Sequence, residues 1–291
     1  MKVLVIGGSG QIGHELCCLF DGAGISYHAP LRNELDLVDH KSVALYIKTL
    51  SPDFVINTAG YRDAGHATWE PSRCFSINRD AVANLAKVCA RENAALVQIS
   101  SWRIFNGQKK DSYTEKDTPD PESVLGNAFW QGEQQVSQHC PRHIILRLSW
   151  IIGEVGHNRV TRLLKSFTAG EAAGTCPLHR GCPTTATDVA RVLLAITQQL
   201  SCGINVWGTY HYSSAEAVDE YTLAEMVLAE ASQYFDADVN HLPIDKKDNQ
   251  KAVNACLDSK RLTHTFGIKP RSWKEELPHL VKSYYQKLHS D

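Results

Sequence analysis

The sequence predicts the α/β fold class, with a doubly wound parallel sheet and a smaller lobe in the last third of the chain. Short apolar runs alternate with longer segments whose apolar residues recur at helical spacing. The runs are apolar at nearly every position, which is typical of strands buried on both faces of a parallel sheet. A chain of 291 residues is long enough to bury one large core or two lobes that share an interface.

The first strand and helix are predicted within residues 2–24. KVLVIG is a short β-branched run that ends in glycine, and Ile12, Leu16 and Leu19 fall on one face of the helix that follows. Asp39 is the predicted N-cap of the second helix. Further strands are expected at residues 25–30, 53–60, 95–101 and 143–153, and helices at residues 39–50, 77–94 and 129–139.

The pattern becomes less regular after residue 152. Residues 168–185 are predicted to form a loop, and residues 188–200 and 221–235 to form helices. We therefore divide the chain into a first domain at residues 1–152 and a smaller lobe at residues 153–291, parts of which are expected to return to the first domain.

Charge and composition favour a small-molecule ligand. The formal net charge is −2, and lysines and arginines are scattered, so neither nucleic acid nor a membrane surface is expected as a partner. No export signal or membrane span is recognised, which predicts a cytoplasmic protein. The nine cysteines form no C-x-x-C pair, so no metal site is expected, and most are interpreted as small core residues.

The motif GGSGQIG indicates a dinucleotide site. Gly7, Gly10 and Gly13 follow the first strand at the mouth of the first helix, with Gln11 and Ile12 between them. A tight turn, a close backbone approach to a pyrophosphate and free helix N–H groups all require small residues there. A purely structural glycine turn is the alternative. The first domain is therefore expected to be of the Rossmann type.

The choice between NADP and NAD stays open. Asp36 and Leu37 lie where the adenosine is expected, and Asp36 can accept a hydrogen bond from it. Arg32 is a candidate partner for a 2′-phosphate, but it is also interpretable as an ordinary solvated residue. NADP is slightly preferred on this basis.

A series of short motifs resembles one family in order along nearly the whole chain. The motifs are LDL, INTAGY, ISS with FNG, LRLSW, GCPT with DVA, GTYHYSS, ACLDSKRL and the tryptophan of RSWKEEL. Together they resemble the extended short-chain dehydrogenase/reductases of the dTDP-4-dehydrorhamnose reductase type. The same family includes the regulatory β subunit of methionine adenosyltransferase, so kinship alone does not establish turnover.

The resemblance implies a cofactor domain and a smaller lobe that closes over a nucleotide sugar. It places Asn57, Ala59 and Tyr61 along the cofactor, and hydroxyls of Ser100 and Ser101 near the substrate carbonyl. The substrate side is expected to comprise Arg62, Trp102, Arg147, Ser149 and Trp150. For Trp150, plain core packing is the alternative. Such reductases often pair, so a homodimer or another protein partner is also considered.

The family's catalytic tyrosine and lysine are missing. Leu125 and Phe129 stand at their positions, and no tyrosine in the chain has a lysine four residues later. A tyrosine would give a proton to the carbonyl oxygen, and a lysine would lower the pKa of that phenol. Neither leucine nor phenylalanine can do this. The register is fixed by Pro121, Val124, Gly126, Gly132 and Glu133.

Residues at other positions also depart from the family pattern. Gly65 and Thr68 replace acidic residues of the family pattern, Trp102-Arg103 replaces an Asp-Tyr pair, and Lys251-Ala252 replaces an Arg-Pro that the resemblance associates with phosphate. These changes reflect either a remodelled ligand site or drift. His66 is the candidate replacement acid, with a satisfied or solvent-facing histidine as the alternative.

Three functions remain open at this point. The first is a binding or regulatory protein that keeps the cofactor and has lost the chemistry. The second is an active NAD(P)H-dependent reductase of a nucleotide 4-ketosugar or related carbonyl, with His66 or a water held by Ser101 as donor. The third is a non-redox enzyme, for which no dedicated base is identified. The sequence favours the first, because function depends on the site rather than the fold.

Overall fold

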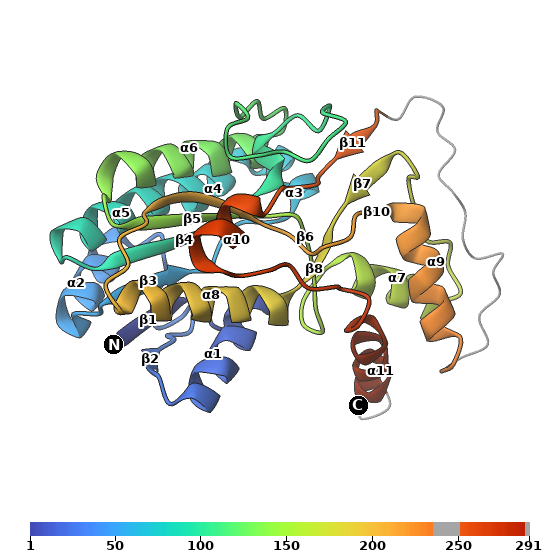
Figure 1. The fold of residues 1–291 in the computed structure, drawn as a ribbon, viewed down its shortest axis with the longest axis horizontal. Helices are drawn as coiled ribbons and strands as arrows, with labels where there is room; N and C mark the ends of the chain where they lie inside the picture. Colours follow the sequence, from blue (N-terminus) through green and yellow to red (C-terminus); the bar gives the residue numbers. More distant parts are fainter. Residues whose placement is uncertain (235–250, 289–291) are drawn as a thin grey trace.

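The computed structural model describes residues 1–234 and 251–288. At its centre is a six-stranded sheet in the order β2-β1-β3-β4-β5-β9, parallel throughout (Figure 1). The predicted α/β class with a parallel sheet is confirmed. The strands are β1 (Lys2–Ile6), β2 (Ser26–His28), β3 (Phe54–Asn57), β4 (Ala95–Ser101), β5 (His143–Leu148) and β9 (Gly208–Tyr212).

Helices cover both faces of this sheet. On one face, α1 (Gln11–Ala23), α8 (Ala186–Ser201) and α10 (Lys260–Phe266) pack over the strands in one apolar cluster. On the other face lie α2 (His40–Leu50), α5 (Val82–Arg91) and α6 (Val124–His139). Every residue of β3 and β5 is buried, which explains why these runs lack polar alternation.

Three segments of the last third of the chain return to the first sheet. Strand β9 extends it beyond β5, α8 packs against α1, and α10 contacts both β9 and α8. In Figure 1 the red α10 accordingly lies over the left-hand lobe, far from the red α11 (Leu277–Leu288).

The second lobe is small and built around its own apolar cluster. It holds a three-stranded sheet in the order β10-β7-β11 and a parallel pair of β6 and β8. Its helices are α7 (Arg159–Thr168), α9 (Glu220–Ala231) and α11. Its strands are β6 (Trp150–Ile152), β7 (His179–Gly181), β8 (Pro183–Thr185), β10 (Val218–Asp219) and β11 (Val253–Asn254).

Two sequence predictions need correction here. The segment 143–153 is not one strand, because it leaves the first sheet at Ser149 and continues as β6 in the second lobe. Ser149 Oγ donates to the carbonyl of Ala255 (2.8 Å) and accepts from the N–H of Cys182 (3.1 Å), which ties the break to the second lobe. The predicted loop at 168–185 contains β7 and β8. The helix expected at 221–235 is α9, and the last residue of that range, Phe235, lies outside the described residues.

Helix starts follow the expected chemistry. Asp39 caps α2 by accepting the N–H of Ser42 (3.1 Å), as predicted. Helix α6 begins at Val124, five residues before its predicted start, because Ser123 caps it by accepting from Gly126 N–H (3.0 Å). Before α5 the chain forms α3 (Ala64–Trp69), α4 (Pro71–Phe75) and a π-helical turn at Ser76–Ala81, and a short 3₁₀ turn follows β4 at Trp102–Ile104.

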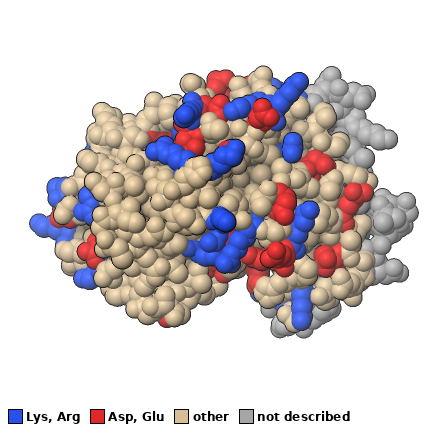
Figure 2. Space-filling model, viewed as in Figure 1, with Lys and Arg blue, Asp and Glu red and all other residues tan. Residues whose placement is uncertain are grey.

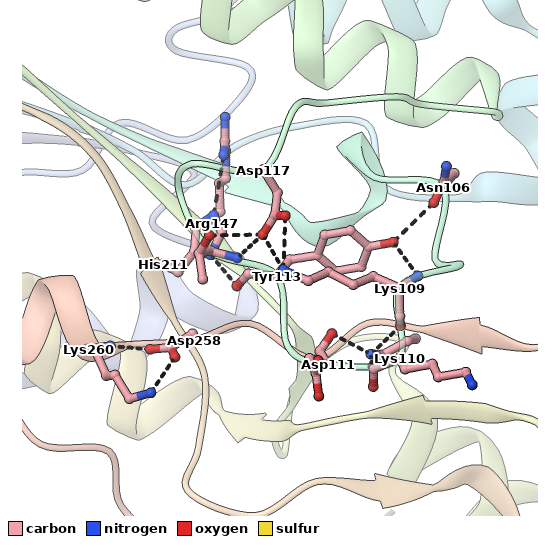
Figure 3. A network of polar contacts seen from close by, with 12 residues as sticks. Asn106, Lys109, Lys110, Asp111, Tyr113, Asp117, Arg147, His211, Asp258 and Lys260 are labelled. Atoms are coloured by element: carbon pink, nitrogen blue, oxygen red, sulfur yellow. Dashed lines mark hydrogen bonds and ion pairs between the residues drawn. The ribbon is translucent and has the colours of Figure 1, made fainter.

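The segment between β4 and α6 is tied to both lobes (Figure 3). The Tyr113 ring stacks on Phe105 with centroids 4.2 Å apart, and Asn254 donates to the carbonyls of residues 109–111. The carbonyl of Tyr113 lies 3.0 Å from Nδ1 of His211, and Nε2 of His211 lies 3.3 Å from a guanidinium nitrogen of Arg147. Because the guanidinium can only donate, His211 carries its proton on Nδ1.

Charges are dispersed, as the sequence predicts. On the face shown in Figure 2, acidic and basic side chains are mixed rather than separated into one basic field. Six of the nine cysteines are buried, in agreement with a core role. Among the described residues, no helix combines the length and the apolar character needed to cross a bilayer.

Candidate functional site

The glycine turn lies between β1 and α1. Gly7 has a φ of +84°, and its carbonyl accepts from Gly10 N–H at 2.9 Å. A Cβ on Gly13 would collide with that same carbonyl, so the first turn of α1 can press against the turn only because residue 13 is glycine. No side chain caps α1, which leaves its first N–H groups open to an anionic ligand.

A groove extends from this turn to the end of β2, and we call it the cofactor groove. Of the predicted cofactor residues, it brings together Gly7, Gly10, Arg32, Asp36, Leu37 and Ala59. Its other lining residues are Ile6, Ser9, Pro30, Leu35, Thr58, Gly60, Arg62 and Ile77. The Asp36 carboxylate also accepts from Val38 N–H (3.2 Å), which holds the local turn.

Other residues expected at the cofactor lie elsewhere. Asn57 is fully buried and does not line the groove. Its side chain donates to Gln98 (2.8 Å) and accepts from Ala59 N–H (3.1 Å), which fixes the backbone of the lining residue Ala59. Tyr61 lies outside the groove, and its hydroxyl donates to Glu70 (3.1 Å). Gln11 and Ile12 face a second cavity beside the groove.

We call this second cavity the central cavity. It lies where the end of β4, the start of α6, β6 and the start of α7 meet. Its lining consists of Gln11, Ile12, Thr58, Arg62, Ile99, Ser100, Ser101, Trp102, Arg103, Leu125, Phe129, Leu148, Ser149, Trp150, Ile151, His157, Asn158 and Arg159.

The two predicted hydroxyls differ in their partners. Ser100 Oγ donates to Glu133 at 2.5 Å, so its proton is already engaged. Ser101 Oγ accepts from Arg103 N–H at 3.3 Å, and its own proton has no acceptor among residues 1–234 and 251–288. Ser101 is therefore the hydroxyl that is free to donate into the central cavity.

Arg147 does not reach the central cavity. Its guanidinium pairs with Glu133 at 2.7 Å, and both side chains are almost fully buried (5% and 2% exposed). The pair joins β5 to α6 behind Ser100. Arg147 therefore stabilises the packing behind the cavity without lining it. The other predicted substrate-side residues Trp102, Ser149 and Trp150 do line the cavity.

Leu125 and Phe129 face the central cavity one helical turn apart. Leu125 is 1% exposed and packs with Ala67, Cys74 and Ala128 in a small apolar cluster, against which Phe129 also packs. In the described part of the chain, no tyrosine, lysine, aspartate or glutamate lines this cavity. Helix α6 therefore presents no proton donor to a carbonyl held there.

The family model described as the RmlD substrate binding domain matches residues 1–286. The chain belongs to this family. A dTDP-4-dehydrorhamnose reductase of Aggregatibacter actinomycetemcomitans is 29% identical over 289 residues, which cover 96% of this chain and 98% of that protein. Methionine adenosyltransferase 2 subunit beta of Bos taurus is 28% identical over 286 residues, covering 93% and 84%. A crystal structure of dTDP-4-dehydrorhamnose reductase from Bacillus anthracis in complex with NADP has a TM-score of 0.85 at 23% identity and covers 96% of each chain. The resemblance predicted from the motifs is confirmed.

Within this RmlD-type site, His66 is not where a replacement acid is needed. Its side chain is 75% exposed, and Nδ1 lies 3.2 Å from Asp63 Oδ2. It borders a shallow depression with Tyr61 and Arg73, outside the central cavity. The histidine that does line the cavity is His157, an exposed residue immediately before the N-cap of α7. His157 could not be predicted as a site residue, because its loop carries no recognisable sequence signal.

Two arginines on the first turn of α7 were also missed. Arg159 and Arg162 lie three residues apart, so they share a helix face, and both border a cavity that adjoins the central one. The Arg159 guanidinium carbon lies 3.9 Å from the centroid of the Trp150 ring, and its Nη2 lies 3.0 Å from Glu220. Burial lowers the pKa of Arg159 to about 10, although Glu220 opposes the shift. Arg159 therefore stays charged at neutral pH.

Proposed function

We propose that this member of the RmlD substrate binding domain family binds NAD(P)(H) and a nucleotide-sugar-type ligand, and acts through binding or regulation rather than by the family's reduction. One observation carries the proposal: α6 presents Leu125 and Phe129 to the central cavity, whose lining among the described residues has no tyrosine, lysine or carboxylate. A positioned acid contributes on the order of 10²- to 10⁴-fold in rate, and this wall of the cavity cannot supply one.

The cofactor part of the proposal rests on the glycine turn. Its compactness, the uncapped start of α1 and the adjoining groove all fit a dinucleotide pyrophosphate. When bound, the cofactor would supply hydride. The Bacillus anthracis structure holds NADP, which supports a nicotinamide cofactor here. Arg32 in the groove favours NADP slightly over NAD.

A protein that binds ligands without catalysis would act through a protein partner. The similarity to a chain named as subunit beta of methionine adenosyltransferase 2 supports this role, because that relative is part of an assembly. A second copy of this chain is the simpler partner. We keep both as alternatives within the proposal.

An active reductase is the second candidate, and two observations favour it. Ser101 has a hydroxyl proton without an acceptor among the described residues, and the exposed His157 is part of the cavity lining. An imidazole can donate a proton near neutral pH. A substrate carbonyl held between these groups could then be reduced by the cofactor.

Fluorescence and absorbance distinguish the two candidates. NADPH fluorescence on titration with protein reports binding, and loss of NADPH absorbance with a panel of nucleotide 4-ketosugars reports turnover. Binding without absorbance loss supports the binding protein. Absorbance loss that His157→Gln or Ser101→Ala abolishes supports the reductase and overturns the proposal. Glu122→Gln, which changes an exposed carboxylate on the protein surface, is the matched control.

A further inference from the structure

Two cysteines, Cys182 and Cys256, lie on two segments that carry the chain back from the second lobe to the first. Cys182 stands between β7 and β8, ahead of α8, and Cys256 follows β11, ahead of α10. Helices α8 and α10 pack on the first sheet, whereas β7 and β11 belong to the second lobe. The two cysteines therefore mark two connections between the lobes.

Strand pairing brings these two positions side by side. Strands β7 and β11 are parallel, with Asn254 opposite Arg180. The N–H of Ala255 donates to the carbonyl of Arg180 at 2.7 Å, which continues the pairing one residue beyond β11. Two residues further along each segment, the same register places Cys256 opposite Cys182. Residues opposite each other on neighbouring strands direct their side chains to the same face.

The hydroxyl of Ser149 lies between the two segments. Its Oγ accepts from Cys182 N–H (3.1 Å) and donates to the carbonyl of Ala255 (2.8 Å). This is the place of the next hydrogen bond in a parallel pair of strands. Ser149 is also the residue at which the chain leaves the first sheet for β6. Three connections between the lobes consequently meet here.

The two thiols contact each other in a buried environment. Cys182 is 5% exposed and Cys256 is 3% exposed. The Cys256 thiol donates a hydrogen bond to the sulfur of Cys182, which lowers the pKa of Cys182 and raises that of Cys256. Burial opposes the decrease at Cys182, whereas the charge of Arg180 supports it. Of the two, Cys182 therefore becomes a thiolate more readily, and the thiolate is the form that reacts with oxidants.

We propose that Cys182 and Cys256 are a site of oxidative modification, where a hydroperoxide converts the two thiols to a disulfide. The Cys182 thiolate attacks one oxygen of hydrogen peroxide, the O–O bond breaks, and hydroxide leaves and takes up a proton to become water. Cys182 is then a sulfenic acid. The sulfur of Cys256 attacks that of Cys182, an S–S bond forms, and a second water leaves with the proton of Cys256. The thiols lose two electrons and two protons, which the peroxide accepts.

The disulfide would join two connections between the lobes covalently. It would link residues that are remote in sequence, and this restricts the unfolded chain and stabilises the folded one. It would also hold the segment after β11 against β7 beside Ser149, which lines the central cavity. The inference is independent of the proposed function, because it requires neither a bound cofactor nor the reduction of a substrate.

Peptide mapping by mass spectrometry tests the proposal on the full chain. The exposed Cys18 and Cys202 are first changed to serine, so that disulfides between molecules do not interfere. The folded protein is treated with hydrogen peroxide, and its remaining thiols are then blocked with a maleimide in denaturant. We expect linked peptides that contain Cys182 and Cys256, the loss of two free thiols per molecule, and reversal by dithiothreitol. Oxidation should also raise the midpoint of thermal unfolding by at least about 4 °C.

Single substitutions in this background test the order of the steps. Cys256→Ser should leave Cys182 as a sulfenic acid that dimedone traps, and its thermal midpoint should not rise on oxidation. Cys182→Ser should leave Cys256 unlabelled by dimedone. Cys140→Ser, which changes a buried cysteine outside the pair, is the matched control and should still form the linked peptides. Circular dichroism confirms that each variant is folded.

Several outcomes would overturn the proposal. They are the absence of linked peptides from the folded protein, linkage only after unfolding, linkage of Cys182 to a different cysteine, and an unchanged thermal midpoint after oxidation. Dimedone labelling of Cys256 in Cys182→Ser, without labelling of Cys182 in Cys256→Ser, would overturn the assigned order of the two thiols.

Discussion

The carboxylate of Glu133 on α6 is shared between Ser100 of β4 and Arg147 of β5, at distances of 2.5 and 2.7 Å. These contacts join a helix and two strands directly behind the central cavity. The pair is buried, so its loss would leave an uncompensated charge in the core. The Glu133–Arg147 pair fixes the position of α6, the helix that carries Leu125 and Phe129.

Glu133→Ala should lower the free energy of unfolding by about 3–5 kcal/mol, because Arg147 would be left buried and unpaired. Urea denaturation measures this. The matched control is Glu122→Ala, which removes an exposed ion pair with Lys251 and should cost far less, because solvent screens that pair. A cost for Glu133→Ala as small as that of the control would contradict the role assigned to the buried pair.

Stability should fall in mild acid because of His211. Burial lowers the pKa of His211 from 6.5 to about 3, with the charge of Arg147 acting in the same direction. Between these two values the unfolded chain binds a proton that the folded chain does not, so stability is complete above pH 6.5 and decreases as the pH falls. The contribution is about 1.4 kcal/mol for each pH unit within this window.

His211→Gln tests this pH dependence, since an amide keeps hydrogen-bonding capacity toward Tyr113 and Arg147 but does not titrate. Urea denaturation from about pH 7 to about pH 5 should show a shallower loss of stability in the variant than in the wild type. Parallel curves for the two proteins would rule out His211 as the source. The exposed His14 changed to Gln is the control, and it should leave the curve unchanged.

Arg62 should serve both ligands. It lines both the cofactor groove and the central cavity, and its Nη2 lies 3.9 Å from the position of a Cβ on Gly10 in the glycine turn. Arg62→Gln should therefore weaken NADPH and dTDP alike, each by about 10-fold, because it removes a charged donor beside both. Fluorescence titration and calorimetry measure the two affinities. Arg73→Gln, at an exposed position nearby, should change neither, and loss of only one affinity for Arg62→Gln would refute the shared role.

Much of the fold could be predicted because its signals are local. The apolar run before Gly7 and the cap at Asp39 specify strand and helix ends through short-range chemistry. The break at Ser149 could not be predicted, because its partners Cys182 and Ala255 are remote in sequence. Apolar residues continue on both sides of Ser149, so the hydrophobic pattern does not predict that the strand ends there.

The site could be predicted only in part, because some of its features depend on local sequence and others on contacts between remote residues. Leu125 and Phe129 could be placed by motif register, and the structure brings both to the central cavity. The partners of Arg147 depend on how α6 packs on β5, which spacing alone does not reveal. Likewise, both His66 and His157 are exposed, and only tertiary structure shows that His157 lines the central cavity whereas His66 does not.

We propose that two apolar side chains, Leu125 and Phe129, occupy the place of a proton donor. Leu125→Tyr/Phe129→Lys restores a phenol and an ammonium group one helical turn apart beside Ser101. NADPH oxidation with a nucleotide 4-ketosugar is the direct measurement, and Leu125→Phe/Phe129→Met is the matched control. If the wild type lacks a proton donor here, the double variant should oxidise NADPH at a rate at least about 10²-fold above that of the wild type. A wild-type protein that already oxidises NADPH as fast as the double variant would contradict this proposal.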